Sequence, residues 1–255
     1  MAAGRLGNKV KIIGVIQARM NSERLPGKIF AKVNGEESLL ALIWRRISGV
    51  EIEWWLATTN SPADDVTEIW GSSNGLKVFR GDEDDVLSRF SAIVSKSKCD
   101  WVVRVTADNP LVDSFVINEL ISQAATAPSD IDVIGDKLAE RYFPLGYIPE
   151  IVRAAALIRI EKELSSDVFY HRSNVTSALY PEKSQKFSNN ELPKRSQWRW
   201  TIDTNLDLFM VRELFRRIGD GRINPNYLEL VQFLDSNEQI ANINQSVTQK
   251  GIEEG

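Results

Sequence analysis

Cysteine and histidine are almost absent from this chain of 255 residues, which contains one of each. A single cysteine, Cys99, excludes an internal disulfide and a zinc site built from several cysteines. A single histidine, His171, gives little support to a Ser-His-Asp relay or a histidine-rich zinc centre. His171 lies in YHRSN, where an exposed polar residue with no chemical role is the simpler interpretation. Catalysis by this chain would therefore rest on carboxylates, lysines and arginines.

Long apolar runs are also absent. No stretch approaches the roughly 20 apolar residues of a membrane span, and MAAGRLGNK at residues 1–9 lacks a secretory apolar segment. We expect a cytoplasmic protein that does not bind a membrane. A net charge of −4 argues against a broad basic surface for nucleic acid, so any anion site must be local. The apolar share of 43% is that of a soluble globular chain and predicts a packed core.

Two familiar phosphate-binding signatures are missing. The spacing G-x-G-x-x-G does not follow the first apolar run, which excludes the usual dinucleotide loop. The only Gly-Lys pair, Gly27-Lys28, is followed by Ile29 rather than Ser or Thr, which excludes a Walker loop.

Strand-like and helix-like patterns alternate along the first half of the chain. Apolar or β-branched runs predict strands at 11–16, 53–59, 76–80 and 100–106, and helical spacing predicts helices at 38–47, 61–75, 82–97 and 113–125. We expect acidic residues in the first turn of the helix at 82–97 and Asp113 as the cap of the helix at 113–125. This alternation predicts an α/β fold with a mostly parallel, doubly wound sheet.

The pattern changes in the second half of the chain. We predict an α/β core at 10–134 and a smaller inserted subdomain at 135–197. The chain then returns to the core at 198–235, with a strand at 198–203 and a helix at 206–218. The last part, 236–255, is a polar tail that we expect to fray.

The stretch QARMNSERLPGK follows the first predicted strand, at the sheet edge where open α/β folds bind their ligands. Arginine and lysine in one loop can neutralise much of a triphosphate, and Pro26-Gly27 can turn the loop back toward the strand. The alternative is a solvated basic loop. The candidate phosphate ligands are Arg19, Ser22, Arg24 and Lys28.

Two carboxylates follow predicted strands and should lie near this loop. Asp108 comes directly after the strand at 100–106, and Asp203 ends the strand predicted at 198–203. Together with phosphate oxygens, they are the ligands that Mg²⁺ prefers. Each also has a simpler interpretation, Asp108 as a turn residue and Asp203 as a helix cap.

These segments together resemble a known family. VIQARMNSERLPGKIF, WLATTNSPADD, VFRGDEDDVLSRF, WVVRVTADNPLVD and WRWTIDT are similar, in this order, to the cytidylyltransferases of the spore-coat polysaccharide biosynthesis type, which are related to keto-deoxy-octulosonate and acylneuraminate cytidylyltransferases. The resemblance covers about residues 10–217. It implies a Rossmann-like nucleotide-diphospho-sugar transferase fold, a homodimer, and transfer of CMP from CTP to a sugar or sugar acid with Mg²⁺ and release of pyrophosphate, for surface polysaccharide or glycan synthesis.

The resemblance also implies roles for individual residues. The nucleotide would be bound by Arg19, Ser22, Arg24, Lys28 and Asn60. The catalytic residues would be Arg19, Lys28 and Asp108. The metal would be held by Asp108 and Asp203, and the acceptor would be contacted by Arg172 and Asn174.

The acceptor is left open, because the family's Y-P-x-G-L-D-V-E and R-E-H-V-T segments are altered here to YFPLGYIPE and RSNVT. Two other functions also stay open. One is a glycosyltransferase of related fold, which the lack of a D-x-D after a strand disfavours, and the other is a nucleotide-binding protein without catalysis.

Overall fold

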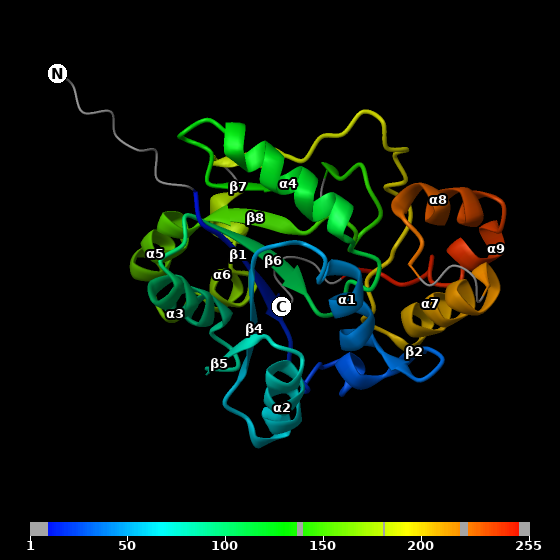
Figure 1. Ribbon diagram of the computed structural model, residues 1–255, viewed down its shortest axis with the longest axis horizontal. Helices are drawn as coiled ribbons and strands as arrows, with labels where there is room; N and C mark the ends of the chain where they lie inside the picture. Colours follow the sequence, from blue (N-terminus) through cyan, green and yellow to red (C-terminus); the bar gives the residue numbers. More distant parts are fainter. Residues whose placement is uncertain (1–9, 137–139, 181, 220–223, 250–255) are drawn as a thin grey trace.

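A seven-stranded sheet runs through the middle of the protein in the order β5-β4-β1-β6-β8-β7-β9 (Figure 1). The computed structural model describes residues 10–136, 140–180, 182–219 and 224–249. Residues 1–9, in which we expected no secretory segment, and residues 250–255 of the predicted tail lie outside this part. The strands are β1 (Ile12–Gln17), β4 (Glu53–Thr59), β5 (Lys77–Gly81), β6 (Trp101–Thr106), β7 (Val133–Gly135), β8 (Glu150–Arg153) and β9 (Ser184–Lys186).

The sheet is mostly parallel, as the sequence predicts. Strands β5, β4, β1 and β6 are parallel to one another, whereas β8 is antiparallel to both β6 and β7. Strands β8 and β9, from the segment predicted as an insertion, are hydrogen-bonded into this same sheet. A separate ribbon pairs β2 (Lys32–Asn34) with β3 (Glu37–Ser38).

Helices cover both faces of the sheet. One apolar core lies under α3 (Val86–Ser97) and α5 (Ala154–Glu163), and a larger one lies under the helices of the opposite face. The helices of that opposite face are α1 (Leu39–Ile47), α2 (Asp65–Ser73), α4 (Ser114–Thr126), α7 (Asn205–Ile218), α8 (Tyr227–Asp235) and α9 (Glu238–Ala241). Shorter helical segments are η1 (Lys28–Phe30), η2 (Pro62–Asp64), α6 (Phe169–Asn174) and η4 (Ser177–Leu179).

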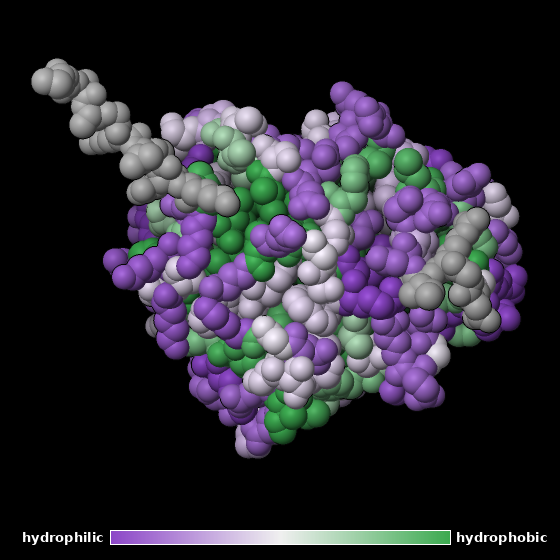
Figure 2. Space-filling view, viewed as in Figure 1, coloured by the Kyte–Doolittle hydropathy of each residue, from purple (hydrophilic) through white to green (hydrophobic). Residues whose placement is uncertain are grey.

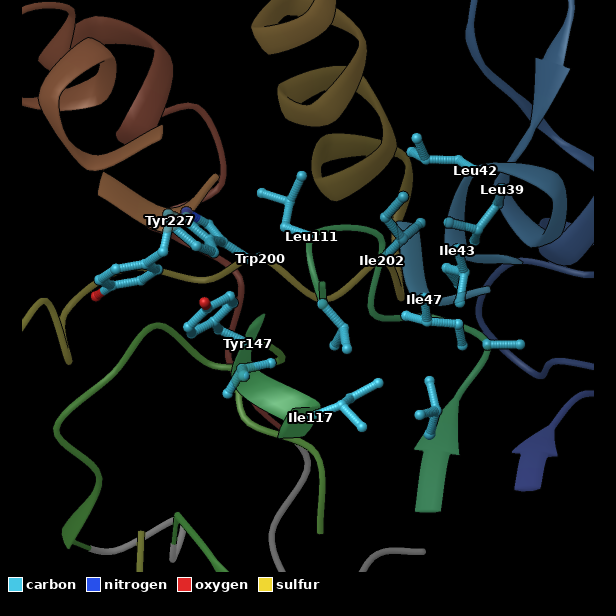
Figure 3. Close-up of a cluster of buried hydrophobic side chains, with 14 of the residues drawn as sticks. Leu39, Leu42, Ile43, Ile47, Leu111, Ile117, Tyr147, Trp200, Ile202 and Tyr227 are labelled. Carbon is cyan, nitrogen blue, oxygen red and sulfur yellow. The ribbon is translucent and has the colours of Figure 1, made fainter. Parts of the chain in front are cut away.

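The larger core joins the N-terminal and C-terminal parts of the chain. Apolar residues of α1 pack toward Leu111 and Ile202, which come from two distant segments (Figure 3). Beside them the ring of Tyr147 stacks on Tyr227 at 4.3 Å between centroids. On the face shown in Figure 2, hydrophilic residues cover most of the surface and hydrophobic residues form scattered patches. In the part of the chain that is described, every helix is too short or too polar to cross a bilayer.

Strand β1 is buried on both faces, which explains its nearly continuous apolar sequence. Gly14 is required within it, because a side-chain carbon at this position would lie 2.2 Å from the ring of Trp54 on the neighbouring strand β4. The register pairs Gln17 with Thr106, so β1 and β6 end side by side at one edge of the sheet.

Three predictions about elements are wrong. Segment 198–203 forms one isolated bridge, between Arg199 and Leu145, rather than a strand, because its backbone pairs with Leu145 and with the carbonyl of Asp108. Helix α3 begins only at Val86, since Asp82 accepts the backbone N–H groups of two following acids and forms a turn before the helix. Much of the tail is packed rather than frayed, because α9 buries Ile240.

The predicted cap is confirmed, since the Asp113 carboxylate accepts the N–H of Val116 at the start of α4.

Candidate active site

The loop after β1 turns back on itself and directs a lysine inward. Gly27 has a φ of +71°, a left-handed conformation that glycine adopts readily, and its N–H donates to the carbonyl of Met20 at 2.8 Å. Lys28 follows at the start of η1 and is 8% exposed. Pro26-Gly27 therefore makes the turn that the sequence predicts.

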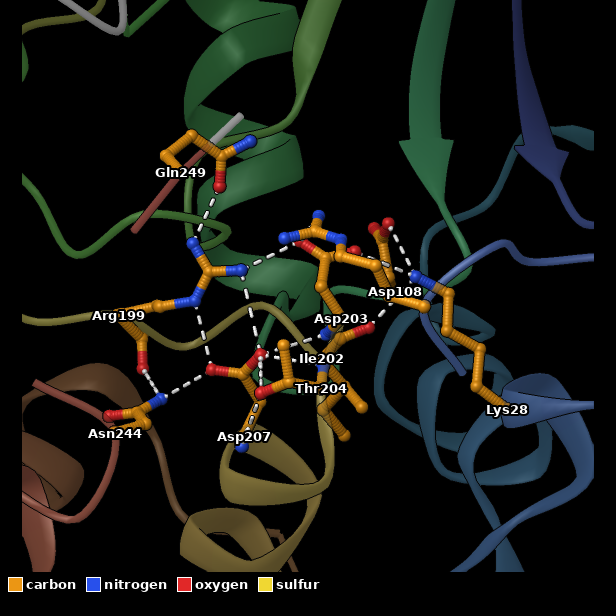
Figure 4. Close-up of polar contacts among 10 residues, drawn as sticks. Lys28, Asp108, Arg199, Ile202, Asp203, Thr204, Asp207, Asn244 and Gln249 are labelled. Carbon is orange, nitrogen blue, oxygen red and sulfur yellow. Dashed lines mark hydrogen bonds and ion pairs between the residues drawn. The ribbon is translucent and has the colours of Figure 1, made fainter. Parts of the chain in front are cut away.

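The Lys28 ammonium joins the two carboxylates that the sequence singles out (Figure 4). Its Nζ donates to Oδ2 of Asp108 at 3.1 Å and to Oδ1 of Asp203 at 2.9 Å. A third hydrogen bond, to the carbonyl oxygen of Ile202, measures 2.8 Å. The loop after β1, the turn after β6 and the segment before α7 thus meet at one nitrogen atom.

The electrostatics of this cluster keep both partners charged. Burial lowers the pKa of Lys28, but the charges of Asp108 and Asp203 and the hydrogen bonds to them outweigh burial, and the pKa is raised above its ordinary value. Burial raises the pKa of Asp203, but Lys28 and then Arg24 and Arg199 outweigh it, and the pKa is lowered. Lys28 and Asp203 therefore form an ion pair.

Asp203 also connects the cluster to a buried network beneath it. Its Oδ2 lies 2.9 Å from Nη2 of Arg24 and 2.7 Å from Nη2 of Arg199. Arg199 in turn donates through Nε to the buried Asp207 at 2.8 Å. The Asp207 carboxylate accepts the N–H of Thr204 and forms the capping box that starts α7. Asn244, near the end of the described chain, donates to both Asp207 and the Arg199 carbonyl.

A hollow of about 460 Å³ opens over this cluster. Besides the loop after β1, its walls include the turn before α3 and one side of α6. A second hollow of about 300 Å³ shares part of this wall and extends toward β8. The residues that line both hollows are Arg24, Arg104, Thr106, Asp108 and Asp203. The cluster therefore lies between two adjoining cavities, each large enough for a small ligand.

Most of the predicted site residues lie around the larger hollow. Its walls include Arg19, Ser22, Arg24, Lys28, Asp108, Asn174 and Asp203. Arg19 lies 3.6 Å from a carboxylate oxygen of Glu83.

Two predicted residues lie outside these walls. Asn60 is exposed at the end of β4, and its N–H donates to the carbonyl of Gly81. Arg172 is 8% exposed and is paired with Asp85 through Nε at 2.9 Å, so it anchors α6 to the start of α3. The structure thus separates Arg172 from Asn174, which the sequence places together.

The sequence did not single out the residues that hold the site in shape. Arg104 is a charged residue within the buried strand β6, and a charged residue in an apolar run can be recognised in the sequence as a candidate for a specific role. The spacing of Thr204 and Asp207 is that of a capping box, a second readable signal. Nothing in the local sequence of Asn244 indicates its contact with Arg199.

Asp108 and Asp203 are the side chains of this site that could hold a metal ion. Within the described residues, no group of three or more acidic, histidine or cysteine side chains is placed to hold an ion. Asp108 and Asp203 nevertheless lie close together, because both accept a hydrogen bond from the ammonium group of Lys28. Two carboxylates fit Mg²⁺, which is commonly held by one or two carboxylates with substrate phosphates and water.

The mostly parallel sheet, with a cation-bearing loop and a carboxylate pair at one edge, is a Rossmann-like arrangement that suits a phosphate-bearing ligand. The chain belongs to the cytidylyltransferase family, whose model matches residues 13–217.

Relatives match along nearly the whole chain. Spore coat polysaccharide biosynthesis protein SpsF from Bacillus subtilis is 31% identical over 242 residues, covering 90% of this chain and 96% of that protein. An uncharacterised protein from Methanocaldococcus jannaschii is 33% identical over 251 residues, covering 96% and 99%. A cytidylyltransferase structure from Leptospira borgpetersenii has a TM-score of 0.83 at 26% identity, covering 95% of this chain and all of that one.

Proposed function

We propose that this protein transfers CMP from CTP to a hydroxyl group of a sugar or sugar acid, uses Mg²⁺ and releases pyrophosphate. The observation that carries the proposal is the Lys28–Asp108–Asp203 cluster in the wall of the larger hollow. Membership of the cytidylyltransferase family supports CTP as the donor. The likeness to a spore coat polysaccharide biosynthesis protein supports a place in surface polysaccharide or glycan synthesis.

In this proposal the cations of the loop bind the triphosphate. Arg19, Arg24 and Lys28 bring positive charge and Ser22 brings a hydroxyl to the wall of one cavity, and Arg24 and Lys28 are paired with Asp203 in the protein alone. They neutralise the charge that grows on the leaving pyrophosphate, and such preorganised donors are commonly the largest contribution to catalysis. Asp108 and Asp203 would hold the metal, which when bound supplies Lewis-acid stabilisation of phosphate oxygens.

The second hollow would hold the acceptor, because it meets the first at Asp108 and Asp203. An acceptor hydroxyl oxygen forms a bond to the α-phosphorus while the bond from that phosphorus to the bridging oxygen breaks. Pyrophosphate leaves, and the hydroxyl proton passes to solvent. No covalent intermediate with the protein is needed, so the single cysteine and histidine are no obstacle.

The test is an assay of pyrophosphate release by the purified full chain with CTP, MgCl₂ and a panel of sugars and sugar acids. The variant Asp108→Asn is expected to lose turnover by about 100-fold or more, because it removes one of the two carboxylates of the cluster. Asp130→Asn, at an exposed position, is the matched control and should keep full activity. Absence of both CTP binding and pyrophosphate release in the wild type would refute the proposal.

The nucleotide base is tested separately by thermal unfolding with each nucleoside triphosphate and MgCl₂. A ligand at 100 times its dissociation constant adds about 2.7 kcal/mol to the free energy of unfolding. We expect the largest rise in melting temperature with CTP. An equal rise with all four nucleotides would contradict cytosine selectivity while leaving triphosphate binding intact.

A further inference from the structure

Arg89 is a buried cation in the wall of the larger hollow. It lies near the start of α3 and is 1% exposed. Its Nη2 makes one long hydrogen bond, to the carbonyl oxygen of Glu83 at 3.4 Å. Within the part of the chain that is described, Nε and Nη1 have no hydrogen-bond partner. Burying a guanidinium with two unpaired donors lowers the stability of a fold, so Arg89 is not explained by packing alone.

A second buried arginine shows how this fold satisfies a guanidinium. Arg46 is also 1% exposed, but it lies outside the lining of both hollows. Its Nε, Nη1 and Nη2 all donate, at 2.8–3.0 Å, to oxygens of Leu111, Val112, Asn224 and Pro225. The unpaired donors of Arg89 are therefore not shared by the buried arginine that is remote from the site.

The charges near Arg89 come from the loop after β1, from the start of α2 and from the turn before α3. Burial and then the charge of Arg19 lower the pKa of Arg89 to about 10, so the guanidinium is still charged at pH 7. Asp64, Asp82 and Glu83 oppose this lowering, but none of their carboxylates accepts a hydrogen bond from Nε or Nη1. Glu83 lies 3.6 Å from Arg19 instead. The electrostatic partners of Arg89 thus leave both donors open.

The position of Arg89 is fixed by its stem rather than by contacts of its charged end. At Gly81, the last residue of β5, a side-chain carbon would lie 2.7 Å from Cγ of Arg89. The close approach of β5 and α3 therefore requires glycine at this position. A cation that the backbone holds in place, with its donors unpaired, is preorganised for a ligand.

We propose that Arg89 is a nucleotide-binding residue, and that its Nε–H and Nη1–H groups donate to an oxygen of the bound nucleotide. This inference rests on the proposed function and adds a residue of α3 to its site. Two parts of CTP offer such an oxygen, the phosphate groups and the carbonyl group of the base. A hydrogen bond from a charged donor in a buried place is strong, and it offsets the cost of the unpaired donors. Because Arg89 is almost fully covered in the protein alone, we expect the wall of the hollow to shift on binding.

The first measurement is the melting temperature of the full chain without ligand. Arg89→Met should melt at the wild-type temperature or above it, because an apolar side chain of similar length replaces an unpaired buried charge. The matched control Arg46→Met should melt about 6 °C lower or more, because it leaves buried carbonyl groups and Asp113 without their donor.

The second measurement is the Kd for CTP with MgCl₂ by titration calorimetry, below the melting temperature of each variant. Arg89→Met should raise the Kd about tenfold or more, since hydrogen bonds from a charged group are lost. Arg46→Met should keep the wild-type Kd. Inorganic tripolyphosphate then separates the two oxygen sources. If Arg89→Met also binds tripolyphosphate more weakly, Arg89 contacts the phosphates, and if that Kd is unchanged, Arg89 contacts the base.

Two results would overturn the inference. One is a Kd for CTP that Arg89→Met does not alter in a wild-type protein that binds CTP. The other is a melting temperature of Arg89→Met that falls as far as that of Arg46→Met, which would make Arg89 a structural residue. Both results leave the proposed function standing. A wild-type protein that binds no CTP would refute the proposed function and this inference together.

Discussion

Asp203 shows how one side chain can serve both the site and the fold. It receives Lys28 on one oxygen and the two arginines Arg24 and Arg199 on the other. The sequence predicts the proximity of Asp203 to Lys28 and Asp108, because strand ends and a following loop share one sheet edge. It does not predict Arg199 as a partner. The segment 198–203 alternates between apolar and polar residues as a strand does. This pattern does not show that the side chain of Arg199 contacts Asp207 at the start of α7.

The lowered pKa of Asp203 makes part of the stability dependent on pH. Its pKa in the folded protein lies below the value of about 3.9 for an unfolded chain, so its ion pairs stabilise the fold above that value. This contribution is lost as the pH falls through the lowered pKa. We expect Asp203→Asn to be less stable than the wild type at pH 7, and the difference to shrink below about pH 4. Urea unfolding from pH 7 to pH 3 measures it, and a difference that is constant with pH would contradict the assignment.

At the scale of elements, the first half of the fold follows from its periodicity. Strands β1, β4, β5 and β6 lie within two residues of their predicted bounds, because buried parallel strands carry continuous apolar runs bounded by polar turns. The second half is less regular. Strands β7 and β9 have only three residues each, too few for an apolar pattern to stand out, and β8 is an antiparallel strand whose partner cannot be read from local sequence.

The start of helix α7 is an element on which the site depends. Asp207 is fully buried, caps the helix together with Thr204 and holds Arg199. We expect Asp207→Ala to lower the free energy of unfolding by about 3 kcal/mol or more, because it removes one of the two carboxylates that pair with the buried Arg199 guanidinium, together with the helix cap. Thr204→Ala, which removes only the cap, should cost about 1 kcal/mol. Equal losses in chemical denaturation would show that Arg199 does not need Asp207.

At the scale of the whole molecule, the two ends of the described chain meet the same core. The site is assembled from β1 near the beginning, from β6 in the middle, and from a network that includes Asn244 and Gln249 near the end. The polar composition of the tail does not predict these contacts, because asparagine and glutamine are also common in exposed chain ends. The contact between Asn244 and the carbonyl of Arg199, 45 residues apart, is set by how the tail packs, and the local sequence of the tail does not reveal it.

The packed tail leads to a prediction for the whole fold. Asn244 is fully buried and donates to Asp207 and to the carbonyl of Arg199. Asn244→Ala should lower the free energy of unfolding by about 1–3 kcal/mol, because buried acceptors lose their donor. The exposed Asn242 belongs to the same segment, and Asn242→Ala is the matched control. Thermal unfolding measures both; equal melting temperatures for the two variants would mean that the tail adds little.

The close approach of Gly14 to Trp54 has a consequence for how such chains diverge. The Trp54 ring occupies the space above Gly14 and meets the ring of Trp44 edge-on at 6.0 Å, so it links β1, β4 and α1. Neither position can change freely alone: a larger residue at 14 needs a smaller one at 54, and a smaller residue at 54 leaves a void beside α1. We therefore expect the two positions to be replaced together during evolution, and relatives that keep one to keep the other.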